Sequence, residues 1–87
     1  MMAEADGRLD EAVDGFRGAV AAWRDLGEPY EHGMAALGLG RCLVASGNGT
    51  QAEEALAEAR EIFERLKAAP AIAETDAVLA EAIALSS

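Results

Sequence analysis

Three groups of residues in this sequence are of types that can carry chemistry: one histidine, one cysteine and a run of glutamates. His32 would need a second, defined partner to act as a catalyst or a metal ligand, and no Cys, Ser or Asp is placed to supply one. We therefore interpret His32 as a solvated side chain in the first turn of a helix. Cys42 falls beside predicted core positions, where a free thiol packs as a small apolar group; the alternative is a reactive or metal-binding thiol.

The glutamates between residues 53 and 64 lack the arrangement of a metal site. They are spread around a predicted helix, no histidine lies at ligand spacing, and Arg60 and Arg65 are interleaved with them. Gly38-x-Gly40 is not a phosphate-binding loop, because it lies within a predicted helix and no strand precedes it. We therefore expect no metal, no cofactor and no enzymatic activity.

Length and charge exclude several classes of partner. Eighty-seven residues form one small domain, and the net charge is −9. Phosphate groups are held by clustered lysines and arginines, which this chain lacks, so we expect no direct contact with nucleic acid or an anionic membrane surface. No apolar run is long enough to span a bilayer. A single cysteine allows no internal disulfide and fits a reducing, cytoplasmic compartment.

Apolar residues recur at helical spacing in four segments, which predicts an all-α protein. The predicted helices cover residues 8–26, 29–45, a third segment from Thr50 to a break at Ala68-Ala69-Pro70, and 71–85. Thr50 and Glu53 have the spacing of a capping box, so we expect the third helix to begin there. Residues 1–6 look like the end of a preceding helix. Because the helical pattern starts almost at once, we expect the chain to be a piece of a longer protein.

Two of these segments share one spacing of small and large residues. Ala12-x3-Phe16-x2-Ala19 recurs 40 residues later as Ala52-x3-Leu56-x2-Ala59. The register extends to two further pairs, Trp23 with Phe63 and Leu26 with Leu66. A period in this range is typical of stacked helical hairpins, in which no unit buries its apolar face alone. The sequence therefore predicts antiparallel hairpins whose exposed faces serve interaction.

Leu39-Gly40, Leu43, Ala52-x3-Leu56-x2-Ala59 and Pro70 resemble the pattern of the tetratricopeptide repeat (TPR) family, or of a TPR-like helical repeat with a longer period. The resemblance implies a superhelix of about four helices: helix B of one repeat (8–26), a complete repeat (30–67) and helix A of the next (71–85). Small residues are expected where helices cross, because larger ones would force the helices apart. These positions are Gly40, Ala52, Ala59, Ala12 and Ala19.

Residues 36–43 and 59–66 are also similar to the C-terminal repeat arrays of large actinobacterial signalling and transcription regulators. Those proteins carry ATPase, cyclase or DNA-binding domains upstream. This similarity implies that the chain comes from a bacterial cytoplasmic regulator.

The resemblance implies a non-catalytic module that binds a protein or peptide on a concave face built by the A helices. The family's two-carboxylate clamp uses Lys and Asn where Leu37 and Arg41 stand, so that specificity is not expected here. Arg41 could still hold one carboxylate of a partner, or only neutralise nearby glutamates. The residues expected on this face are Met34, Leu37, Arg41, Val44, Glu74, Ala77 and Glu81.

The alternative function is structural self-association without a separate ligand. The first and last predicted helices each lack a neighbour on one apolar face, and such faces tend to be covered by another molecule. We therefore expect a homo-oligomer. The residues expected between copies are Val13, Val20, Trp23, Ile72, Leu79 and Ile83.

Overall fold

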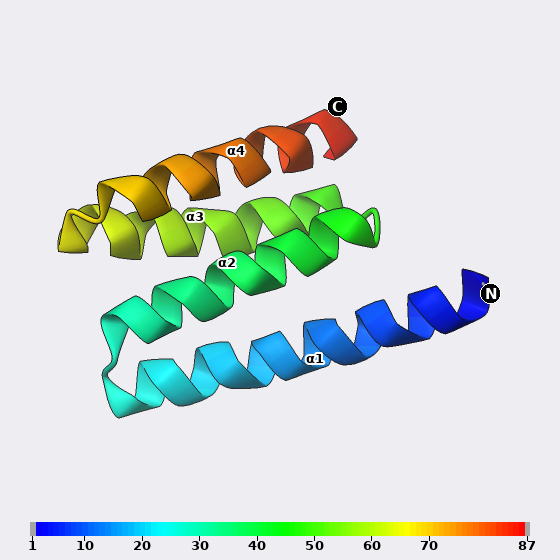
Figure 1. Ribbon diagram of the computed structural model, residues 1–87, viewed down its shortest axis with the longest axis horizontal. Helices are drawn as coiled ribbons and strands as arrows, with labels where there is room; N and C mark the ends of the chain where they lie inside the picture. The colour runs from blue at the N-terminus through cyan, green and yellow to red at the C-terminus, as the bar shows by residue number, and fades with distance from the viewer. Residues whose placement is uncertain (1, 87) are drawn as a thin grey trace.

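The computed structural model describes residues 2–86, with side chains from residue 8 onward, and shows four α-helices (Figure 1). Their bounds are Met2–Leu26 (α1), Pro29–Ala45 (α2), Gly49–Leu66 (α3) and Ala69–Ser86 (α4). Each helix runs antiparallel to the one before it, and the described residues contain no strand. The prediction of an all-α protein built from helical hairpins is therefore confirmed.

The bounds of α2 agree with the predicted segment, α3 begins one residue earlier than predicted, and α1 and α4 are longer than predicted. Residues 2–6 continue α1 and are not the end of a separate helix. Pro70 does not precede α4 but lies in its first turn, where the missing amide proton would have no partner in the helix.

The three turns share one geometry. Gly27, Gly47 and Lys67 have positive φ angles of 72°, 81° and 56°, and the next helix begins two residues after each of them. In each turn the amide that follows donates to the carbonyl five residues earlier, at distances of 3.1, 2.8 and 3.0 Å. A helix and its turn thus occupy 20 residues, so two helices produce the 40-residue period of the sequence.

The predicted capping box at the start of α3 is wrong. The helix begins one residue earlier, at Gly49, with Asn48 as its N-cap, and Asn48 makes no side-chain capping bond. The Glu53 carboxylate accepts a hydrogen bond from Ser86 Oγ of α4 and does not return to the Thr50 amide. The first turn of α3 lies so close to α4 that a Cβ atom at Gly49 would stand 2.8 Å from the carbonyl oxygen of Ala82.

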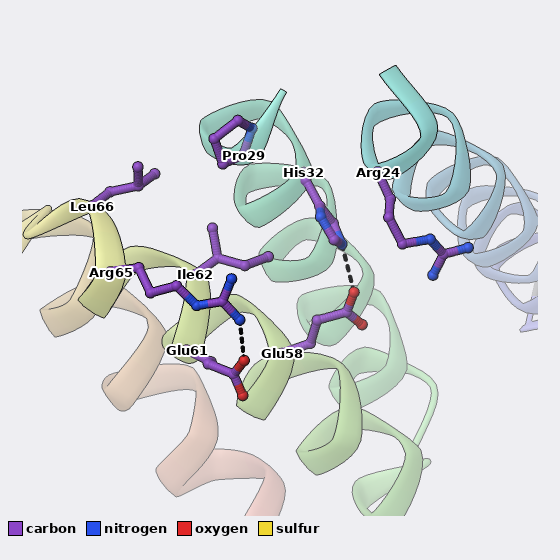
Figure 2. Close-up of a pocket in the computed structure, with 8 residues that line it drawn as sticks. All are labelled: Arg24, Pro29, His32, Glu58, Glu61, Ile62, Arg65 and Leu66. Atoms are coloured by element: carbon purple, nitrogen blue, oxygen red, sulfur yellow. Dashed lines mark hydrogen bonds and ion pairs between the residues drawn. The ribbon is translucent and has the colours of Figure 1, made fainter. Parts of the chain in front are cut away.

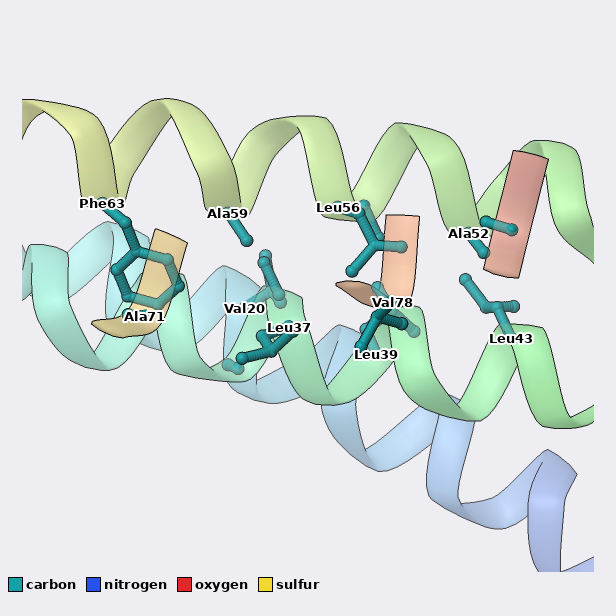
Figure 3. Close-up of a cluster of buried hydrophobic side chains, with 14 residues drawn as sticks. Val20, Leu37, Leu39, Leu43, Ala52, Leu56, Ala59, Phe63, Ala71 and Val78 are labelled. Atoms are coloured by element: carbon teal, nitrogen blue, oxygen red, sulfur yellow. The ribbon is translucent and has the colours of Figure 1, made fainter. Parts of the chain in front are cut away.

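The core lies between α2 and α3 and is closed by α1 and α4 (Figure 3). Its largest fully buried aliphatic and aromatic side chains are Phe63, Leu37, Leu43 and Leu56. Leu26 and Leu66, the last pair of the repeated register, lie outside this core and are 69% and 41% exposed. Each is the last residue of its helix.

Three glycines let other helices approach α2 closely. A Cβ atom added at Gly40 would stand 2.3 Å from Leu56 Cδ2, one at Gly38 would stand 2.4 Å from Phe16 Cε1, and one at Gly33 would stand 2.7 Å from Phe63 Cε1. The α1 side chain therefore presses on one glycine, and the α3 side chains press on the other two. These contacts agree with the expectation that Gly40 lies at a helix crossing.

We expect Gly40→Ala to lower the free energy of unfolding by about 1–2 kcal/mol, because the buried Leu56 cannot move away from the new methyl group. Gly15→Ala is the matched control, since no atom lies within 4 Å of its added Cβ. The control should be up to about 1 kcal/mol more stable through helix propensity alone. Urea denaturation measures both, and equal shifts in the two variants would contradict the assigned crossing.

Lys67 is the one described non-glycine residue with positive φ. That conformation is unfavourable for a residue with a Cβ atom, and the equivalent turn positions are glycines. We expect Lys67→Gly to raise the free energy of unfolding by about 0.5–1 kcal/mol. Lys67→Ala removes the same charge but keeps the Cβ atom, so its thermal midpoint should not rise. A similar rise in both variants would mean that charge, not backbone strain, governs this position.

Candidate functional site

Two apolar hollows lie along α2 and meet at Arg41. We call them together the α2 groove. The first, of about 370 Å³, lies between α1 and α2, and the second, of about 310 Å³, lies between α2 and α4. Each is at the small end of the range of ligand pockets. The first is lined by Phe16, Ala19, Trp23, Glu31, Met34, Ala35, Leu37, Gly38 and Arg41, and the second by Arg41, Val44, Ala45, Val78 and Glu81.

Most residues expected on the concave face do lie at this groove. Met34, Arg41, Val44 and Glu81 line it and are at least partly exposed. Leu37 is a correction, because its side chain is fully buried in the core and is not available to a partner. α2 is packed by helices on several sides, so the face that it leaves open is narrower than expected.

The remaining two expected residues are on α4. Ala77 is exposed but lines neither hollow, and Glu74 is half exposed beside Arg41. The Arg41 guanidinium donates to the Glu74 carboxylate and so joins α2 to α4. Of the two roles considered for Arg41, neutralising a glutamate is the one that this geometry shows.

The carboxylates at the two ends of the groove differ from Glu74. Glu31 and Glu81 are exposed, and among the residues whose side chains are described neither forms an ion pair. The groove therefore carries two carboxylates and one guanidinium, and a third carboxylate, that of Glu74, lies beside it on Arg41. Its walls are otherwise apolar.

Outside the groove, one ion pair joins α3 to α4 and two others lie within α3. Arg60 bonds to Asp76 at 2.6 Å and to Glu64 at 2.7 Å, and Arg65 pairs with Glu61. The hydrogen bond to Asp76, followed by that to Glu64, raises the pKa of the Arg60 guanidinium above its usual value. Two of the glutamates of α3, Glu61 and Glu64, are thus paired with arginines of the same helix and lie on its exposed face.

The residues expected between copies are only partly open. Val20 is buried in the core, so its predicted role in self-association is wrong. Val13, Trp23, Ile72 and Leu79 are half-buried and pack against the core, and Ile83 is 49% exposed. On α1, a shallow apolar hollow of about 310 Å³ is lined by Ala12, Gly15, Phe16 and Ala19.

A separate hollow of about 590 Å³ involves α1, α2 and α3 but not α4 (Figure 2). Here the expectation for His32 is wrong. Its side chain is only 14% exposed, and Nε2 lies 2.5 Å from Oε2 of Glu58 on the neighbouring helix. The chain folds back at the turn around Gly47, which brings His32 of α2 opposite Glu58 of α3. The predicted antiparallel pairing of these two helices could have indicated this contact.

His32 and Glu58 join α2 to α3 at this hollow. The residues that line this hollow include no serine, threonine, cysteine or tyrosine; they are Arg24, Pro29, His32, Glu58, Glu61, Ile62, Arg65 and Leu66. The pair therefore acts as a link between α2 and α3. Cys42 is half-buried on α2 as a free thiol.

Two other kinds of feature are absent from the described residues. No group of three or more His, Cys, Asp or Glu side chains within them is placed to hold a metal ion. None of the helices in this part of the chain has the length and apolar character needed to cross a bilayer.

Comparison with known proteins identifies the family. Residues 1–65 match the sequence model of the tetratricopeptide repeat, a family whose repeats mediate protein–protein interaction. No curated protein and no solved structure matches the chain. The matched residues include all of α2 and nearly all of α3, the helices of the central hairpin. Since the match covers well over half of the sequence and the helices pair as antiparallel hairpins, the chain belongs to the tetratricopeptide repeat family.

Proposed function

We propose that this chain is a non-catalytic interaction module that binds a segment of another protein in the α2 groove. The observation that carries the proposal is the pair of adjoining apolar hollows along one helix. Met34 is 37% exposed in the first, and Val44 is half-buried in the second. Two side chains of a bound segment could therefore be buried while its backbone passes over Arg41.

The size of the groove sets the strength of binding. Two hollows of this volume hold a few side chains, so the buried area falls at the low end for protein complexes, below about 1,200 Å². Such interfaces are transient. The groove is built on helices held by the core, so a partner binds to a surface that is already formed, without the added entropy of ordering it.

The same proposal includes the organisation of the repeats. α1 acts as helix B of one repeat, α2 and α3 as a complete repeat, and α4 as helix A of the next. The 20-residue spacing of the turns at Gly27, Gly47 and Lys67 supports this division. We place the module in a bacterial cytoplasmic regulator, on the strength of the resemblance of residues 36–43 and 59–66.

A substitution within the groove tests the proposed function. Peptides would first be selected from a random library on the immobilised chain, and their affinities then measured for two variants. We expect Val44→Asp to weaken binding about tenfold or more, because it places an unpaired charge in an apolar hollow. Ala57→Asp, on the exposed surface of α3 and outside both hollows, is the matched control. If the selected peptides bind both variants equally, the groove is not the site.

A second candidate function is self-association, which the apolar surface at the two ends of the chain favours. On α4, Ile83 and Leu85 are 49% and 48% exposed, and α1 has the apolar hollow around Gly15. Leu79, Ala80 and Ile83 also repeat, 40 residues later, the register of Leu39, Gly40 and Leu43. α4 could therefore receive α1 of a second copy much as α2 receives α3.

Mixing two blocked variants tests this head-to-tail pairing. Ile83→Lys blocks the α4 face, and Gly15→Lys blocks the α1 face at a site with no atom within 4 Å of the added Cβ. We expect each variant alone to be monomeric at about 50 µM, and a mixture to form a dimer but nothing larger, since one open face remains on each partner. Light scattering measures the mass. A monomeric parent chain, or a mixture that stays monomeric, would contradict the pairing.

A further inference from the structure

We infer that the segment bound in the α2 groove is basic, with apolar residues for the two hollows and a lysine or arginine beside each of them. The inference rests on the proposed function and adds the chemistry of the partner. It rests on the charged side chains of the groove that have no ion-pair partner among the described residues.

The groove has only one cation, and that cation is already paired. Among the residues that line the two hollows, with Glu74 counted because it is bonded to Arg41, Arg41 is the sole basic group, and its guanidinium donates to Glu74. The carboxylates of Glu31 and Glu81 stand in the first and second hollows without an ion-pair partner among the described side chains. The groove therefore has a net charge of −2, divided between its two ends.

An acidic segment would meet repulsion in this groove. Its carboxylate would share the Arg41 guanidinium with Glu74, and it would enter a groove that also carries the unpaired carboxylates of Glu31 and Glu81. A basic segment breaks no existing contact, because Glu31 and Glu81 are open to new partners. The chain's net charge of −9 acts in the same direction at longer range, drawing cations toward the surface and slowing the approach of anions.

The spacing of the hollows restricts the segment further. Met34 and Val44 are ten residues apart on α2, which corresponds to about 15 Å along a helix. An extended chain covers that distance in about five residues. The basic residues belong outside the two apolar ones, since Glu31 precedes Met34 on α2 and Glu81 lies in the second hollow beside Val44.

Three matched octapeptides test the inference. All have leucine at positions two and seven and blocked termini, and the flanking positions one and eight hold lysine, glutamine or glutamate. The chain's single tryptophan, Trp23, lines the first hollow and reports binding by its fluorescence. We expect the lysine peptide to bind about fivefold more tightly than the glutamine peptide at low salt, from two exposed ion pairs. The glutamate peptide should bind most weakly, and the differences should shrink at about 1 M salt, where the Debye length is about 3 Å.

Variants of the groove assign the preference to its carboxylates. Glu31→Gln and Glu81→Gln should each reduce the ratio of lysine-peptide to glutamine-peptide affinity by about twofold, and together they should abolish it. Glu54→Gln is the control, because it removes the same charge from an exposed position of α3 outside the groove.

The outcomes separate the inference from the proposed function. If the glutamine or glutamate peptide binds as tightly as the lysine peptide and Val44→Asp abolishes that binding, the groove is a binding site but its partner is not basic. If the lysine preference survives the double variant of Glu31 and Glu81, the inference is also wrong. If none of the three peptides changes Trp23 fluorescence or the nuclear magnetic resonance signals of Val44, both are wrong.

Discussion

The absence of side chains at three positions of α2 is the constraint on which the rest of the structure depends. Gly33 and Gly40 accept Phe63 and Leu56 of α3, while Gly38 accepts Phe16 of α1. Each glycine costs about 1 kcal/mol of helix propensity relative to alanine, so α2 is a weak helix by itself. Its stability comes from the side chains that fill these positions, and it is the described helix that packs against all three others.

The same packing explains how the candidate site arises. Because α1 and α3 are drawn close to α2, the side chain of Leu37 is fully buried, and the exposed residues of α2 at the groove are Glu31, Met34, Arg41 and Ala45. α4 closes one side of the groove through its packing on the core, and Arg41 joins α2 to it by the ion pair with Glu74. Helix packing therefore determines the shape and the apolar walls of the groove. The ion pair of Arg41 with Glu74 leaves the carboxylates of Glu31 and Glu81 as the charges available to a partner.

Much of the fold could be predicted from the sequence, because it is encoded in local patterns. Apolar spacing, the residues of the turns and the 40-residue register were sufficient to locate α2 and the hairpins. The errors concern contacts between residues far apart in the chain. Glu53 bonds to Ser86 instead of closing a capping box, and His32 meets Glu58 across the hairpin. Residue type and local spacing contain no information about such pairs until the helices are placed relative to one another.

The central claim is that the α2 groove is the binding surface of this chain. Mapping amide chemical shifts in an isotope-labelled sample, while a lysine-flanked peptide is added, tests it most directly. We expect the largest changes on residues of both hollows, including Met34, Arg41, Val44 and Glu81. Changes confined to the hollow around His32 and Glu58, with the α2 groove unaffected, would contradict it.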